Sequence, residues 1–342
     1  MSEHLVFLLF TNCKVVTGAK RSIICDLQRG EFDFIPNDLT EILTVHKDKT
    51  LVEIKNSYHS ESEREIEAYF DFMISKEYGF WGEKENRALF PDIGLTWCSP
   101  SIVTNSIIDV NETSNHDFEK IFTELEELGC RDLQIRFYSE TNAVFIEKLL
   151  SMLTYSRIKS VELIIKNNLN FAFEAIEHLT ARHPRIRNVI IHSSPEFKLA
   201  KINKVNGRGN IIYVSDVIDS ASHCGIIHPT NFVVNLPTFM ESQQYNSCLN
   251  GKISIDVNGN IKNCPSMNEN FGNIQKVSLK KVSLNNTFKK VWSIHKGQIE
   301  ICKDCEFRHI CSDCRAYLKN PDDMHSKPLK CNYNPYTAQW TN

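Results

Sequence analysis

The residues best suited to chemistry are cysteines. Of the twelve in the chain, eight lie from residue 224 onward: Cys224, Cys248, Cys264, Cys302, Cys305, Cys311, Cys314 and Cys331. Two pairs are separated by only two residues, a spacing that lets a turn bring both sulfurs to one metal. Thiolates so arranged bind Zn²⁺ or the iron of an iron–sulfur cluster, since both take tetrahedral sulfur. The pattern therefore predicts a metal centre, and the spacing alone leaves zinc and iron–sulfur open.

The other cysteines are scattered, and Cys13, Cys25 and Cys130 have the apolar neighbours of small buried side chains. The apolar run from Leu5 to Phe10 is too short for a signal peptide and lacks a basic flank. No run of about 18 apolar residues predicts a membrane span. We expect a cytoplasmic protein with no membrane partner, in which thiols bind metal and do not pair as disulfides.

Composition excludes several classes of protein. The 342 residues are 42% hydrophobic and 24% charged, unlike a disordered chain, a collagen or a membrane bundle. Lysine and arginine total 39 against 42 aspartates and glutamates, a net charge of −3. This balance gives no long basic patch, so we expect no nucleic-acid partner.

The cysteine order resembles a known domain. Cys248-x10-Gly259-x4-Cys264, then Cys302-x2-Cys305-x5-Cys311-x2-Cys314 and finally Cys331, is similar to the SPASM domain of radical SAM peptide-modifying enzymes. One departure is that two residues, not three, separate Cys311 from Cys314. More narrowly, the chain resembles the grasp-with-spasm group, in which a SPASM protein accompanies an ATP-grasp ligase and a precursor peptide. The segments that carry this likeness are 247–252, 260–265, 302–308, 311–317, 327–331 and 334–337.

The resemblance implies two auxiliary [4Fe–4S] clusters. Cys248, Cys264 and Cys314 would hold the first cluster, and the second would be held by Cys302, Cys305, Cys311 and Cys331. The first cluster then needs a fourth ligand, for which Cys224 is the nearest unassigned thiol. The flanking His223 and His228 are weaker candidates, and an iron site left open for a substrate group is the other option.

Radical SAM enzymes also need Cys-x3-Cys-x2-Cys after the first barrel strand. Two segments could be that strand here, Gly94–Trp97 and Ser106–Val110. The first is followed only by Cys98, and the second by no nearby cysteine. We therefore expect no SAM cofactor and no SAM cleavage.

Hydrophobic periodicity indicates the elements that must position these thiols. Residues 1–90 look like a small α+β entry domain, with a helix over 60–76 and a short helix over 39–45 capped by Asn37 or Asp38. Residues 91–218 alternate strands (106–110, 133–138, 161–166, 188–193, 210–215) with helices (116–128, 143–153, 171–181), which favours a parallel sheet. Four or five such units are too few for a full eight-fold barrel, so we expect an α/β fold with a partial (β/α) barrel or open sheet. Residues 219–342 form the cysteine-rich SPASM domain, with a hairpin turning at Asn258-Gly259.

These features predict an accessory maturation protein for a ribosomally synthesised peptide. It would bind the precursor peptide, partner the ATP-grasp ligase, or both, and would carry two [4Fe–4S] clusters. One alternative is a redox or other peptide-modifying enzyme that uses an open auxiliary cluster. Another is a zinc-bearing structural scaffold. The sequence alone does not decide whether the chain is an enzyme.

Overall fold

The computed structural model describes residues 4–168, 171, 173–202 and 209–341. Its strands are β1 Val6–Leu9, β2 Cys13–Val16, β3 Ser22–Asp26, β4 Glu31–Ile35, β5 Gly79–Gly82, β6 Asn105–Val110, β7 Asp132–Phe137, β8 Ser160–Lys166, β9 Ile186–His192, β10 Lys198–Lys201, β11 Asn210–Tyr213, β12 Lys252–Ile255, β13 Ile261–Lys262, β14 Tyr333–Asn334 and β15 Gln339–Trp340. Its α-helices are α1 Asn37–Thr44, α2 Leu51–Lys55, α3 Glu63–Ser75, α4 Phe118–Glu127, α5 Ala143–Met152, α6 Phe173–Arg182, α7 Leu236–Glu241, α8 Leu279–Ser283 and α9 Asn286–Lys289. None of the described helices is long and apolar enough to cross a membrane.

A mainly parallel sheet of eight strands dominates the molecule, in the order β10-β11-β9-β8-β7-β6-β12-β13. The strands from β11 to β12 in this order are parallel, and β10 and β13 are antiparallel at the two edges. The predicted α/β class is confirmed, and β6 is the first parallel strand, not residues 94–97, which form no strand. The predicted hairpin is also present, and its strand β12 lies beside β6, so the cysteine-rich region extends this sheet.

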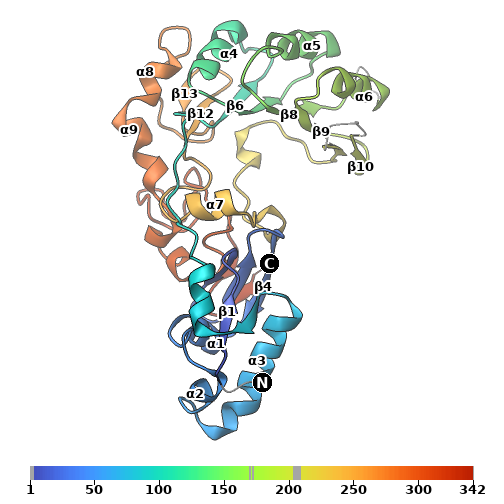
Figure 1. Cartoon of the computed structure of the whole chain (residues 1–342). Coiled ribbons are helices and arrows are strands. Elements are labelled where there is room, and N and C mark those ends of the chain that lie inside the picture. Colours follow the sequence, from blue (N-terminus) through green and yellow to red (C-terminus); the bar gives the residue numbers. More distant parts are fainter. Residues whose placement is uncertain (1–3, 169–170, 172, 203–208, 342) are drawn as a thin grey trace.

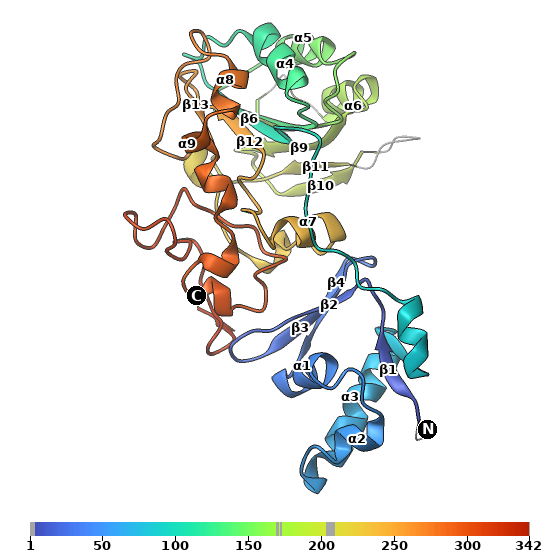
Figure 2. The same ribbon diagram turned by 60° about the vertical axis from the view of Figure 1, so that its left-hand side comes forward.

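The two faces of the sheet carry different side chains. Neighbours in register on one face are Ile108, Ile135, Leu163 and Val189, all buried in the main core under α4, α5 and α6. Figures 1 and 2 show these three helices grouped on that side. The next residue along each strand points to the opposite face, since side chains alternate. That opposite face is therefore free to line a site.

The N-terminal region forms a separate lobe. It combines the three-stranded sheet β2-β3-β4 and the pair β1-β5 with helices α1 to α3. A 3₁₀ turn at Ser60–Ser62 leads directly into helix α3. Together they cover nearly the whole of the helix predicted over 60–76. The predicted cap of the short helix expected over 39–45 was wrong: α1 starts at Asn37, and its N-cap is Pro36. The Asn37 side chain instead accepts a hydrogen bond from the Ser22 hydroxyl (2.6 Å).

The cysteine-rich region contacts both lobes. Figures 1 and 2 show it running along one side of the molecule, from the sheet to the N-terminal lobe. A third apolar cluster joins Ile23 and Cys25 of β3 to Phe307, Ile310 and Tyr333. The thiol region is therefore held between two supports.

Candidate functional site

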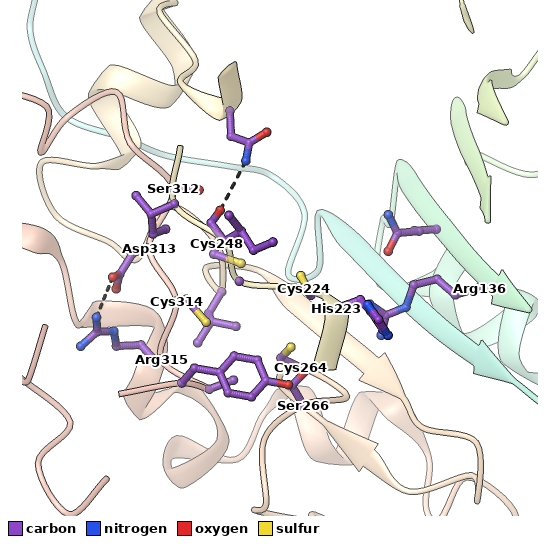
Figure 3. A pocket seen from close by; sticks show the side chains of 18 of the residues that line it. Arg136, His223, Cys224, Cys248, Cys264, Ser266, Ser312, Asp313, Cys314 and Arg315 are labelled. Carbon is purple, nitrogen blue, oxygen red and sulfur yellow. Dashed lines mark hydrogen bonds and ion pairs between the residues drawn. The ribbon is translucent and has the colours of Figure 1, made fainter. Parts of the chain in front are cut away.

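Four predicted ligand cysteines meet in one cavity. Cys224, Cys248, Cys264 and Cys314 all line a cavity of about 520 Å³ (Figure 3). They come from four separate segments, and they are the set predicted around the first cluster with Cys224 as its fourth member. The facing wall is the open face of the sheet, with Arg136 on β7, Ile164 on β8 and Ile190 on β9.

Asn246 builds the turn that presents Cys248. Its fully buried side-chain oxygen accepts hydrogen bonds from the backbone N–H groups of Cys248 (3.0 Å) and Leu249 (2.9 Å). Its amide nitrogen donates to Asp313 Oδ2 (2.6 Å). Next to it, the Ser247 hydroxyl donates to the Cys311 carbonyl and accepts from the Asp313 N–H, each at 3.1 Å. These bonds tie the Cys248 turn to the loop that carries Cys311 and Cys314.

The hairpin positions Cys264, which follows strand β13 and the buried Asn263. The Asn263 side chain accepts from Trp292 Nε1 (2.8 Å) and donates to the Phe288 carbonyl (2.9 Å). Burial raises the pKa of the Cys264 thiol to about 11. Because metal ligation requires the thiolate, binding at this site must release a proton.

Cys224 lies on a loop that closes against Cys314. At Gly225 the backbone φ is +88°, and a Cβ there would stand only 2.9 Å from Cys314 Sγ. Glycine therefore allows the loop to reach the other thiols. The Lys330 ammonium donates to the Cys224 carbonyl (2.8 Å), and the Ser266 hydroxyl donates to the Ala221 carbonyl (2.9 Å).

The alternative histidine ligands are placed less favourably. His223 lines the cavity, but its Nε2 atom lies 3.1 Å from Asp219 Oδ1. His228 does not line the cavity, and its Nδ1 atom pairs with the Thr230 hydroxyl (2.9 Å).

Lys252 supplies positive charge to three of these thiols. Its Nζ atom lies 3.4 Å from Cys248 Sγ, at the start of β12. Burial acts to lower the pKa of Lys252, but the sulfurs of Cys248, Cys264 and Cys224 raise it, and the net shift is upward. An ammonium surrounded by sulfur fits a site that carries net negative charge, as a thiolate-ligated metal centre does.

The second predicted set lies on the far side of the Cys311–Cys314 loop. Cys302 and Cys331 act to raise the pKa of Cys311, Cys331 acts to raise that of Cys302, and Cys311 acts to raise that of Cys305. Burial is the largest cause in each case and raises the pKa of Cys311 to about 12. A 3₁₀ turn at Cys302–Asp304 brings Cys305 back toward Cys302, as its two-residue spacing predicted.

A second lysine lies beside this set. Lys296 is 5% exposed, and its Nζ atom is 3.5 Å from Asp313 Oδ1. Arg315 donates to the same oxygen (2.7 Å) and also to the carbonyls of Met324 and Ser326. The sum of these three buried side chains is one positive charge, placed between the two sets of thiols. This charge also suits thiolate ligation.

The thiols surround a cavity and do not converge on one point. Within the described part of the chain, no three cysteine, histidine, aspartate or glutamate side chains gather as closely as a single metal ion requires. Cys13, Cys25 and Cys130 are buried as predicted, and Cys98 is exposed.

Comparison with known families matches one part of the chain. Residues 247–306 match the family model of SPASM, described as an iron-sulfur cluster-binding domain. This segment is thus similar to a SPASM domain, and the match covers less than half of the chain. The matched segment contains Cys248, Cys264, Cys302 and Cys305, and the remaining predicted ligands lie outside it. The matched model describes domains that bind iron–sulfur clusters.

Comparison with other proteins adds little. No curated protein matches the chain. Among solved structures, the chain is similar to Streptococcus suis SuiB bound to S-adenosylmethionine, at 11% identity and a TM-score of 0.35. It is also similar to SuiB bound to its precursor peptide SuiA, at 11% identity and a TM-score of 0.36. Each alignment covers 96% of this chain and 98% of the SuiB chain.

Sequence reasoning missed the residues that organise the SPASM site. Asn246, Asp313, Lys252 and Lys296 are polar residues close in sequence to cysteines or to the hairpin, but nothing in their spacing marks them. Their role depends on contacts between distant segments, such as the bond from Asn246 to Asp313.

Proposed function

We propose that the protein is an accessory iron–sulfur protein in the maturation of a ribosomally synthesised peptide. Cys224, Cys248, Cys264 and Cys314 would hold one [4Fe–4S] cluster, and Cys302, Cys305, Cys311 and Cys331 a second. The observation that carries the proposal is the meeting of the first four thiols in one cavity, although they come from segments as far apart as residues 224 and 314. Thiols that surround a cavity suit a cluster of several irons better than one zinc ion.

The cavity also offers room for a peptide side chain. Apolar residues form much of its lining, among them Ile164, Ile190, Ile218, Leu249 and Tyr317. A concave apolar site with a few fixed polar groups is typical of ligand recognition. The peptide role itself rests on the resemblance to the grasp-with-spasm group, from which an ATP-grasp ligase is the expected partner.

The absence of SAM cleavage rests on the sequence around β6. The segment that follows this first parallel strand, Asn111–Asp117, contains no cysteine. Without three closely spaced thiolates, the sheet has no ligands there for the cluster that binds SAM. We therefore propose that chemistry on the peptide belongs to the ligase.

The metal assignment is tested by anaerobic purification followed by quantification of iron, sulfide and zinc. We expect about eight irons and eight sulfides per chain, the sum of two [4Fe–4S] clusters. Replacing Cys224, Cys248 or Cys314 by alanine should each remove about half of the iron, whereas Cys130→Ala should retain it. Stoichiometric zinc without sulfide in the wild-type protein would overturn the assignment.

The peptide role is tested by co-expression with an ATP-grasp ligase and a short precursor peptide from neighbouring genes. We expect the tagged protein to co-purify with one or both. Calorimetry should detect precursor binding, and Ile190→Glu in the cavity wall should weaken it. A change in peptide mass caused by this protein alone, without the ligase, would contradict the accessory role.

A further inference from the structure

Among the described residues Lys252 forms no ion pair with a carboxylate, unlike two other lysines of the cysteine-rich region. Lys262, on the paired strand, lies 3.1 Å from Asp256, and Lys296 lies 3.5 Å from Asp313. Among the residues that the structure describes, the hydrogen-bond partner of the Lys252 ammonium is Cys248 Sγ. Lys252 is also half-buried.

This placement is unfavourable unless the thiols become anionic. A sheltered ammonium that faces neutral thiols loses hydration and gains only a weak sulfur acceptor. When the same sulfurs ligate a cluster as thiolates, the ammonium faces net negative charge at short range. The residue is therefore suited to the loaded site and not to the free thiols.

The two arginines that line the cavity cannot serve in the same way, because each has a carboxylate partner, which for Arg315 is Asp313 (2.7 Å). Arg136 lines the facing wall, but its Nε and Nη2 atoms donate to both carboxylate oxygens of Asp109, at 2.6 Å and 2.8 Å. The Asp109–Arg136 pair is neutral as a whole. Lys252 thus places a positive charge directly next to Cys248. The Glu241 carboxylate, whose pKa Lys252 acts to lower, lies within electrostatic range but forms no ion pair with Lys252 among the described residues.

We propose that Lys252 is a positioning residue for the first cluster. The fixed positive charge of its ammonium stabilises the reduced form of that cluster. This inference rests on the proposed function, because it requires a cluster at Cys224, Cys248, Cys264 and Cys314. Reduction adds one electron, taken from an external donor such as dithionite, and involves no proton or bond cleavage. The reduced cluster carries one more negative charge, so a nearby ammonium raises its reduction potential.

The test compares wild type with three variants, reconstituted anaerobically and titrated with dithionite under electron paramagnetic resonance. Lys252→Met keeps the apolar stem and removes the charge, and Lys252→Arg restores the charge. Lys14→Met is the matched control, because Lys14 is another half-buried lysine but lies in the N-terminal lobe beside Asp92. We expect Lys252→Met to lower the reduction potential of one of the two clusters by at least about 59 mV. For a one-electron reduction this is a tenfold change in the equilibrium constant.

Lys252→Arg and Lys14→Met should keep the wild-type potentials. A methionine variant that loads only one cluster, when the arginine variant loads both, also supports the requirement for charge. Equal potentials in wild type and Lys252→Met would overturn the inference but leave the proposed function standing. Failure of both Lys252 variants to load the first cluster would show that charge alone does not restore loading, and would overturn the inference. A wild-type protein that binds no iron would overturn both.

Discussion

Asp109 and Arg136 form a buried ion pair in the wall of the cavity. Their side chains are 2% and 5% exposed, and Tyr138 donates a further hydrogen bond to Asp109 Oδ2 (2.9 Å). Burial raises the pKa of Asp109, although Arg136 acts to lower it. The cost of removing both charges from water thus offsets much of the attraction between Asp109 and Arg136. The pair therefore contributes more to the shape of the cavity wall than to the stability of the fold.

Breaking this pair should be costly, because it leaves a buried charge alone. We expect Asp109→Asn to lower the free energy of unfolding by about 3–5 kcal/mol, measured by denaturant titration. The double variant Asp109→Leu/Arg136→Met should recover most of that loss, since it leaves neither charge behind. An Asp109→Asn variant as stable as wild type would show that water reaches Arg136.

At the level of elements, His192 links three segments at the end of β9. Its Nδ1 atom accepts from the Ile218 N–H (3.2 Å), so Nδ1 carries no proton, and Nε2 donates to the Phe137 carbonyl of β7 (3.1 Å). Burial lowers the pKa of His192 below its usual value. This neutral imidazole therefore attaches the chain that leads to Cys224 to the sheet.

The sign of the resulting pH dependence follows from that lowered pKa. The unfolded chain takes up the proton near its ordinary pKa of about 6.5, while the folded chain resists it. Stability from His192 is thus present above about pH 6.5 and lost as pH falls below it, by up to about 1.4 kcal/mol per pH unit. Between pH 7.5 and 5.5, wild type should lose more stability than His192→Gln in thermal unfolding. The exposed His59→Gln is the control, and parallel curves for wild type and His192→Gln would refute the prediction.

Elements with strong periodicity could be predicted, and those fixed by distant contacts could not. The helix over 116–128 was predicted by its apolar periodicity, and the structure has α4 over Phe118–Glu127. Strands β2, β4 and β5 were missed, because four or five residues carry too little pattern and their pairing is set by neighbours. The cap of α1 was misplaced because Asn37 bonds to Ser22 across the lobe.

The candidate site likewise contains residues that the sequence predicted and residues that only distant contacts define. Cysteine spacing, read through the family resemblance, grouped Cys248, Cys264 and Cys314, and the structure brings them together with Cys224 in one cavity. The bonds of Asn246 and the charge of Lys252 depend on how the hairpin packs against the Cys311–Cys314 loop, which no local pattern encodes.

At the scale of the whole molecule, the N-terminal lobe docks on the loop that follows Cys305. The buried Glu306 accepts hydrogen bonds from Arg21 Nε (2.9 Å) and from the Tyr333 hydroxyl, and the Ala19 N–H donates to the Asp304 carbonyl (2.8 Å). A Cβ at Gly18 would lie 2.9 Å from Glu306 Cβ, so the two backbones meet at a distance that only glycine permits. The order of this loop and the order of the N-terminal sheet are therefore coupled.

Loss of metal should accordingly loosen part of the distant lobe. We expect iron chelation to increase hydrogen exchange in β2 and β3, which share an apolar cluster with Cys305, Cys311 and Cys331. Helix α3 packs in a different cluster and should keep its protection. If chelation leaves exchange in β2 and β3 unchanged, the second thiol set does not support the N-terminal lobe.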